Sequence, residues 1–217
     1  MFWNLVLAHM LGDFVLQTDW IVRKRDNLWV LSLHAGIHFL LMFLLVGVAR
    51  TVVWPYLLLL AFAHLAQDRI KNTITNKRPD LIRVSFVIDQ FIHFFTIGIV
   101  IWLLQNMLGL LPTTQKIVWV MIAIAYLFVT YVWFITERLF NLSDIDYLQN
   151  LNITKYSRML SRGALVSLFL VIQAWTTSGL TLVLSNPYAQ TKFRRRALLT
   201  DFSVSLFAIL FLAWALG

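Results

Sequence analysis

Every histidine in this chain of 217 residues lies four positions from an aspartate or from another histidine. The pairs are His9 with Asp13, His34 with His38, His64 with Asp68, and Asp89 with His93. On a helix, side chains four positions apart lie on one face, one turn above the other. We therefore expect these eight side chains to line one polar site that is buried among helices.

The residue types in these pairs are metal ligands. Neutral imidazole and carboxylate together suit a divalent metal such as zinc, iron or manganese. Eight candidates exceed the needs of one tetrahedral ion, so we expect either two ions, or one ion with the other residues orienting its ligands. Asp68 or Asp89, whichever is not a ligand, is the candidate catalytic base.

Further polar residues extend the same helix faces or follow them closely. We expect them to bind substrate at the rim of the site: Gln17, Arg23, Lys24, Arg25, Arg69, Lys71, Asn72 and Arg83. Cations can hold phosphoryl oxygens while a metal activates water or polarises the P–O bond. This arrangement would suit a phosphate group carried by a lipid.

The composition places these residues in a membrane protein. Hydrophobic residues make up 60% of the chain and charged residues 13%, and the mean hydropathy is +0.77. The N-terminal apolar stretch lacks the features of a cleaved signal peptide, so we expect a retained helix. The absence of cysteine excludes disulfides, thiolate metal sites and a cysteine nucleophile. The net charge of +8 indicates contact with anionic lipid headgroups, and not nucleic-acid binding.

The elements that must position the site are apolar runs of about the length that crosses a bilayer. We expect an all-α, polytopic transmembrane bundle with apolar segments at 2–22, 30–50, 53–74, 84–105, 116–137, 162–184 and 198–216. Residues 1–217 would form one integral membrane domain. Within it, residues 1–105 are the four-helix core that carries the polar site, and residues 116–217 are the C-terminal helices.

The basic residues indicate the orientation of these segments. They concentrate after the first, third and fifth segments, so the N-terminus is expected outside and these connectors in the cytoplasm. A full crossing at 162–184 would leave Lys192 and Arg194 to Arg196 outside. We therefore favour six spans plus a re-entrant hairpin that turns at Thr176 to Gly179, with seven spans as the alternative.

Four phrases carry a resemblance to a known family. HMLGDFVLQTDW (9–20), LHAGIHFLL (33–41), HLAQDRIKN (64–72) and IDQFIHFFTI (88–97) resemble domain-of-unknown-function family 3307, a family of the bacterial inner membrane. The resemblance implies that location and the importance of these positions, and it implies no reaction. The clustered His and Asp residues are more distantly similar to membrane-bound metal-dependent hydrolases.

Three functions are compatible with this pattern. We favour an intramembrane metal-dependent hydrolase that acts at the cytoplasmic face on an amphiphile, such as a phospholipid or a polyprenyl phosphate. The first alternative is a proton or metal-ion transporter that uses the His/Asp ladder as a relay. The second is a non-catalytic scaffold whose polar pairs hold helices together.

Overall fold

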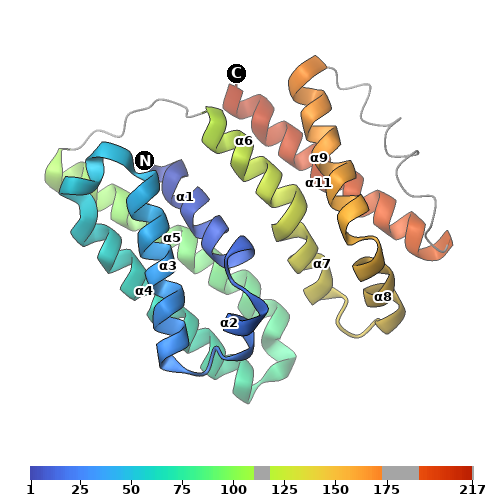
Figure 1. Ribbon diagram of the computed structural model, residues 1–217, viewed down its shortest axis with the longest axis horizontal. Helices are drawn as coiled ribbons and strands as arrows, with labels where there is room; N and C mark the ends of the chain where they lie inside the picture. The colour runs from blue at the N-terminus through green and yellow to red at the C-terminus, as the bar shows by residue number, and fades with distance from the viewer. Residues whose placement is uncertain (110–117, 173–190, 217) are drawn as a thin grey trace. The chain divides into compact units, whose positions relative to one another are not determined.

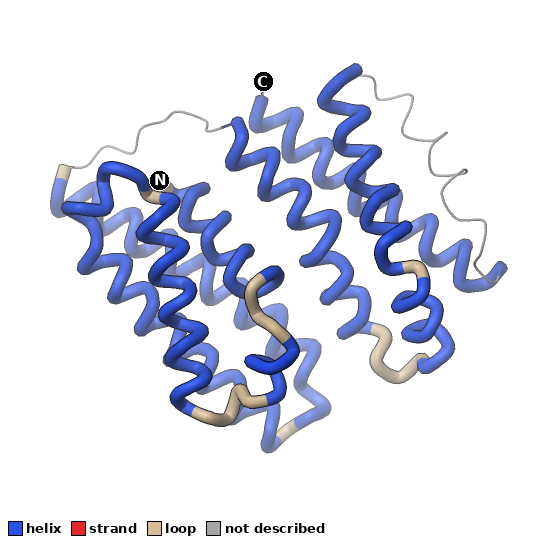
Figure 2. The backbone as a smooth tube through the Cα atoms, in the orientation of Figure 1, coloured by secondary structure: helices blue, strands red, loops and turns tan. Residues whose placement is uncertain are grey.

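The computed structural model describes residues 1–109, 118–172 and 191–216. The chain forms two compact units, Met1–Gln115 and Lys116–Gly217. The described residues of both units are helices joined by short connections, and none of them forms a strand (Figure 2). The expected all-α class is therefore confirmed for the described part of the chain.

The first unit is a ring of four helical elements around a common interior. α1 (Phe2–Met10) runs into a π-helical turn (Leu11–Val15), and α3 (Leu28–Leu45), α4 (Arg50–Lys77) and α5 (Ile82–Leu108) follow. α1 packs against α3 and α5, and α4 packs against the same two helices, so the four surround one interior (Figure 1). The short α2 (Asp19–Arg23) and two 3₁₀ turns, Gly47–Ala49 and Pro79–Leu81, lie in the connections.

Local sequence sets several helix ends in this unit. The side chains of Thr18 and Asn27 accept hydrogen bonds from the backbone of Ile21 and Trp29, and so cap α2 and α3. α5 ends at Leu108, and the residue that follows, Gly109, adopts the left-handed conformation (φ 58°) that glycine reaches without a steric penalty.

The interior of this unit changes from apolar to polar along the helices. On α4, Val53, Leu57 and Leu60 are buried in an apolar core, whereas His64 and Asp68 lie further along the same buried face. Leu5 of α1 and Leu104 of α5 belong to that apolar core. The core therefore fixes the helix positions in one half of the bundle, and the polar site occupies the other half.

The second unit is also helical. α6 (Val118–Leu127), a π-helical turn (Phe128–Val132) and α7 (Trp133–Phe140) follow one another without a break, and α8 (Ile145–Ile153), α9 (Lys155–Ile172) and α11 (Thr191–Leu216) complete the described part. α11 packs against both α6 and α9. The hydroxyl groups of Tyr126 and Ser167 form a hydrogen bond that joins α6 to α9.

Within the described residues, five helical stretches are long and apolar enough to cross a membrane. They are Leu28–Leu45, Gly47–Lys77, Pro79–Asn106, Val118–Phe140 and Arg195–Ala215. These stretches support the expectation of a membrane protein. The first predicted span, 2–22, differs from the structure: its helix ends at Val15, and Thr18 starts a new one. Phe2–Val15 is shorter than the roughly 20 residues that a complete crossing needs.

The sixth predicted segment is described only in part. α9 begins at Lys155, before the expected start at residue 162, and is described as far as Ile172. The expected turn at Thr176 to Gly179 lies outside the described residues. The polar connector before α9 contains α8, which Asp144 caps by accepting a hydrogen bond from the backbone of Tyr147.

Candidate metal centre

The eight predicted side chains come together inside the first unit. They project from α1 and its π-helical turn, from α3, from α4 and from α5, and each has an exposed fraction of 8% or less. Spacing within each helix puts two of them on the inward face, and the ring of helices brings the four pairs together. The pairs thus form one buried cluster of five histidines and three aspartates.

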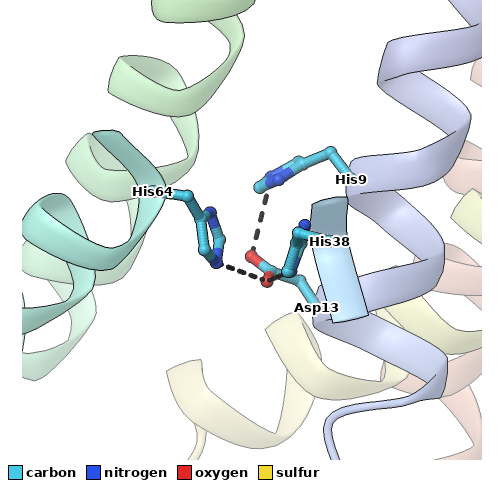
Figure 3. Close-up of side chains that lie close together, drawn as sticks. All are labelled: His9, Asp13, His38 and His64. Atoms are coloured by element: carbon cyan, nitrogen blue, oxygen red, sulfur yellow. Dashed lines mark hydrogen bonds and ion pairs between the residues drawn. The ribbon is translucent and has the colours of Figure 1, made fainter. Parts of the chain in front are cut away.

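Asp13 is the centre of the tightest group. Its Oδ1 lies 3.0 Å from His38 Nε2 and 3.6 Å from His64 Nε2, and its Oδ2 lies 3.6 Å from His9 Nε2. Figure 3 shows the three rings turned toward this carboxylate from three sides. One ligand atom from each of the four residues can be chosen so that all four lie within 4.8 Å of one another.

The backbone at this point is adapted to the close contact. Asp13 lies in the π-helical turn Leu11–Val15, and such single turns are frequent at functional sites. A Cβ atom on the adjacent Gly12 would lie 2.4 Å from both Cε1 and Nε2 of His38. Only glycine therefore lets the π-helical turn approach the His38 ring this closely.

A second group adjoins the first on the side of Asp68. His34 Nε2 lies 3.2 Å from Asp13 Oδ1 and 3.7 Å from Asp68 Oδ2. His64 Nε2 lies 3.3 Å from the same Asp68 oxygen. His34 and His64 therefore link the two carboxylates, and His34, His64 and Asp68 form a second set that could hold an ion.

A third group contains Asp68, Asp89 and His93. His93 Nε2 lies 3.3 Å from Asp89 Oδ1, and His93 Nδ1 lies 3.3 Å from Nδ1 of His64. The ammonium of Lys71 lies between the two carboxylates, 2.7 Å from Asp68 Oδ1 and 2.8 Å from Asp89 Oδ2. This end of the cluster thus already contains a cation.

Gln90 and Gln67 supply neutral contacts around the cluster. Gln90 Nε2 donates to Asp13 Oδ2 at 3.1 Å, and its Oε1 lies 3.3 Å from His9 Nε2. Gln67 Nε2 donates to the hydroxyl of Thr96 at 2.7 Å, which links α4 to α5. Beside these groups is a cavity of about 20 Å³. Four of the five histidines contribute to its lining: His9, His38, His64 and His93. This volume holds about one water molecule.

The donor chemistry and the spacing fit a divalent metal. His64 Nε2 is buried and makes no hydrogen bond of standard geometry to any described residue, and an unsatisfied buried nitrogen is costly. In a tetrahedral zinc site with bonds of about 2.0–2.1 Å, neighbouring ligand atoms lie roughly 3.3 Å apart. The nitrogen–oxygen distances of 3.0 to 3.6 Å around Asp13 are close to that spacing. The buried groups could therefore hold a metal ion.

The predicted substrate-binding residues at the rim do not gather into one cluster as the eight His and Asp residues do. Arg23, Lys24 and Arg69 are exposed, and Arg25 and Arg83 are half-buried. Arg69 donates to the backbone oxygen of Asp26 at 3.0 Å, so it attaches α4 to the connection that precedes α3.

Three other predicted rim residues lie closer to the cluster: two contact it, and the third is buried beside the connection that precedes α3. Gln17 reaches the cluster, with its Nε2 3.5 Å from His34 Nε2. Asn72 is buried and donates to the backbone oxygen of Arg25 at 3.3 Å. Lys71 points inward, with a side chain that is 22% exposed.

Sequence reasoning missed a buried ionic cluster in the second unit. It consists of Glu137 from α7, Arg158 and Arg162 from α9, and Asp201 from α11, with Tyr147 of α8 donating to Glu137. Arg158 and Arg162 have the same four-residue spacing as the histidine pairs. That spacing could have identified them, but Arg158 falls in the connector after the fifth predicted segment, and Arg162 is the first residue of the sixth.

Comparison with known proteins adds a family and no chemistry. No curated protein and no solved structure matches this chain. Residues 1–122, which include all eight side chains of the cluster, match the family described as protein of unknown function (DUF3307). The chain therefore belongs to the family DUF3307, whose matched region contains the whole His/Asp cluster.

Proposed function

We propose that the first unit holds a divalent metal ion, zinc, iron or manganese, through His9, Asp13, His38 and His64. The observation that carries this proposal is the contact geometry around Asp13, where the imidazole nitrogens of the three proposed histidine ligands and that of His34 surround one buried carboxylate at 3.0 to 3.6 Å. The Nδ1 atom of His64, on the side of the ring away from Asp13, contacts Nδ1 of His93, and Nε2 of His93 in turn contacts Asp89. Such outer partners orient a ligand histidine and set its tautomer.

We place this centre in the bacterial inner membrane, in the half of the bilayer that faces the cytoplasm. The basic connectors would lie in the cytoplasm and the N-terminus outside. We retain six spans with a re-entrant hairpin as the proposed topology, and seven spans as the alternative. The first element would then enter the membrane from outside and end at the level of the site. An interrupted helix at membrane depth is stable where protein or a wet cavity covers it.

The reaction that we propose is hydrolysis of an amphiphile that presents a phosphate headgroup at the cytoplasmic face, such as a phospholipid or a polyprenyl phosphate. A bound divalent ion would supply Lewis-acid polarisation of a phosphoryl oxygen. Asp68 would accept the proton from the attacking water, because it is not one of the four proposed ligands and its Oδ2 lies 3.3 Å from the ligand His64. The water oxygen bonds to phosphorus, the P–O bond to the leaving group breaks, and the leaving oxygen takes up the proton from Asp68 to depart as the alcohol.

The exposed cations Arg23, Lys24 and Arg69 would hold the phosphate before reaction. They lie in α2, in the turn after it and on α4, at one end of the first unit. Arginine binds phosphate through paired N–H groups, and lysine binds it as a point charge.

Elemental analysis by mass spectrometry tests the metal, on protein purified without a metal-binding tag. We expect a stoichiometric divalent metal in the wild type and its loss in His64→Ala and Asp13→Asn. Metal-free wild type that takes up no metal on reconstitution would overturn the centre and favour a structural scaffold.

Activity on a panel of phospholipids and polyprenyl phosphates in mixed micelles tests the reaction. Asp68→Asn should lower the rate of headgroup release by about 10²–10⁴-fold, the range for loss of a general base. Folded Asp68→Asn and His64→Ala with full activity on every lipid that the wild type hydrolyses would contradict the assignment.

The size of the cavity favours one other function, transport of protons or metal ions. The space beside the histidines is about 20 Å³, which admits a water or an ion and not a headgroup. In this case the same histidines and aspartates would relay the ion across the membrane. Uptake of protons or a divalent metal into sealed proteoliposomes, abolished in His38→Ala, would establish transport over hydrolysis. Tight liposomes with no uptake would exclude it.

A further inference from the structure

The position of Lys71 distinguishes one end of the cluster from the other. Its ammonium bridges Asp68 Oδ1 and Asp89 Oδ2 at 2.7 and 2.8 Å. Both carboxylates belong to the third group that could hold a metal, together with His93. Because the ammonium is within hydrogen-bond distance of both, it occupies the space between them that an ion would need.

The charges of the buried cluster lead to a definite metal number. Asp13, Asp68 and Asp89 bring three negative charges, and Lys71 brings one positive charge. Among the described residues, no other lysine or arginine forms an ion pair with these carboxylates. With neutral imidazoles, the form that binds a metal, two negative charges remain. Uncompensated charge within a membrane is costly, so one divalent cation would balance the set.

We propose that the cluster holds a single divalent ion, at His9, Asp13, His38 and His64, and that Lys71 is a built-in cation in the place of a second ion. This proposal rests on the proposed metal centre and specifies its number of ions. It implies single-ion chemistry, and not the paired-ion mechanism in which two metals clamp the attacking and leaving oxygens.

The position of Lys71 explains why its ammonium blocks metal binding at the group of Asp68, Asp89 and His93 and not at the group around Asp13. Lys71 lies one turn beyond Asp68 on α4, so its side chain reaches Asp68 and Asp89 but not the group around Asp13. Between Asp13 and Asp68 lies the buried His34, whose Nε2 is 3.2 Å from the first carboxylate and 3.7 Å from the second. Among the described residues, no lysine or arginine forms an ion pair with Asp13, so the far position has no competing cation.

Metal stoichiometry in matched variants tests this inference. We expect one ion per chain in the wild type and two in Lys71→Ala, which removes the ammonium and opens the space. The double variant Lys71→Ala/Asp89→Asn should return to one ion, because it lacks a carboxylate of the second site. Lys77→Ala, at an exposed lysine on the same helix, should keep one ion.

The outcomes separate this inference from the metal centre itself. Metal-free wild type would overturn the centre. One ion in both the wild type and folded Lys71→Ala would overturn the role of Lys71 alone. Two ions in the wild type would overturn the single-ion proposal while leaving the centre intact.

A spectroscopic measurement on the wild type covers the case in which Lys71→Ala does not fold. Wild-type protein loaded with Mn²⁺ should give the electron paramagnetic resonance spectrum of an isolated ion. The spectrum of an exchange-coupled pair would overturn the single-ion proposal without any variant.

Discussion

The two units each bury an ionic cluster, and the clusters differ in whether their charges balance. In the second unit, Arg158 and Arg162 face Glu137 and Asp201, two positive charges against two negative ones. In the first unit, three aspartates face one lysine. Among the described residues, the second cluster is thus electrically complete, whereas the first keeps two negative charges that the proposed metal ion would balance.

The two clusters also differ in whether their side chains leave a lone pair that a metal could use. Arg158 holds Asp201 with two parallel bonds, from Nε to Oδ2 at 2.9 Å and from Nη2 to Oδ1 at 2.6 Å. Its Nη2 also lies 2.9 Å from Glu137 Oε1, and Arg162 Nη1 lies 3.1 Å from Asp201 Oδ1. Guanidinium groups carry hydrogen-bond donors only, so they neutralise and hydrogen-bond the carboxylates but offer no lone pair to a metal. Imidazoles keep a lone pair on one nitrogen, and this is what a metal needs.

The largest effect should follow from breaking the complete cluster. Arg158→Ala leaves Glu137 and Asp201 buried with one cation, which should cost roughly 3–5 kcal/mol of unfolding free energy. Denaturant titration in detergent, followed by circular dichroism, measures this loss. The metal content should stay unchanged. Arg138→Ala, an exposed arginine on α7, should change stability by about 0.5 kcal/mol or less. Equal losses of unfolding free energy in Arg158→Ala and Arg138→Ala would contradict the stabilising role of the buried cluster.

Removing metal should affect the incomplete cluster next most strongly. Chelation should lower the unfolding free energy of the wild type by about 2.7 kcal/mol where free metal had been 100-fold above its dissociation constant. Asp13→Asn, which lacks the central ligand, should show no response to the chelator. The Arg158→Ala variant should respond as the wild type does, because its defect lies in the other unit. An equal chelator response in Asp13→Asn would show that the stabilising metal binds elsewhere.

Disturbing the backbone beside His38 should have a smaller effect. In Gly12→Ala, the new methyl group would overlap the imidazole, which must turn away from Asp13. Metal affinity should fall about 10- to 100-fold, as it does when ligand-orienting contacts are lost. Competition with a fluorescent chelator measures the dissociation constant. Gly36→Ala on α3 is the matched control, since its Cβ would meet no atom within 4 Å. Unchanged affinity in Gly12→Ala would contradict the role of this contact.

The smallest effect should come from trimming the complete cluster at its edge. Tyr147→Phe removes the hydrogen bond to Glu137 but leaves that carboxylate with both arginines, so it should cost about 1 kcal/mol. Burial, together with the hydrogen bond to Glu137, raises the pKa of Tyr147 above its ordinary value of 10.0. The folded state therefore keeps this proton longer than the unfolded state does. Wild-type stability should fall as pH rises above about 10, and more steeply than that of Tyr147→Phe. Parallel pH profiles would contradict this.

The sequence predicted the eight cluster residues because each pair obeys helical spacing within one segment. It did not predict the contacts that complete the site. Gln90 joins His9 to Asp13 across 81 and 77 positions, and Lys71 joins Asp68 to Asp89 across two helices. In the sequence Lys71 belongs with the rim cations, and only the packing of α4 against α5 turns it inward. The cluster of the second unit escaped notice for the same reason, since Arg158 and Asp201 lie 43 positions apart.

Composition and periodicity by themselves determined that this chain is helical, that it has stretches apolar enough to cross a membrane, and which histidines and aspartates share a helix face. Tertiary structure decided where α1 breaks, which imidazole nitrogens face Asp13, and which end of the cluster the ammonium occupies. The physical reason is that spacing along a helix fixes the direction of a side chain relative to its own axis. Distances between side chains on different helices depend on how the helices pack, and a metal site is defined by those distances.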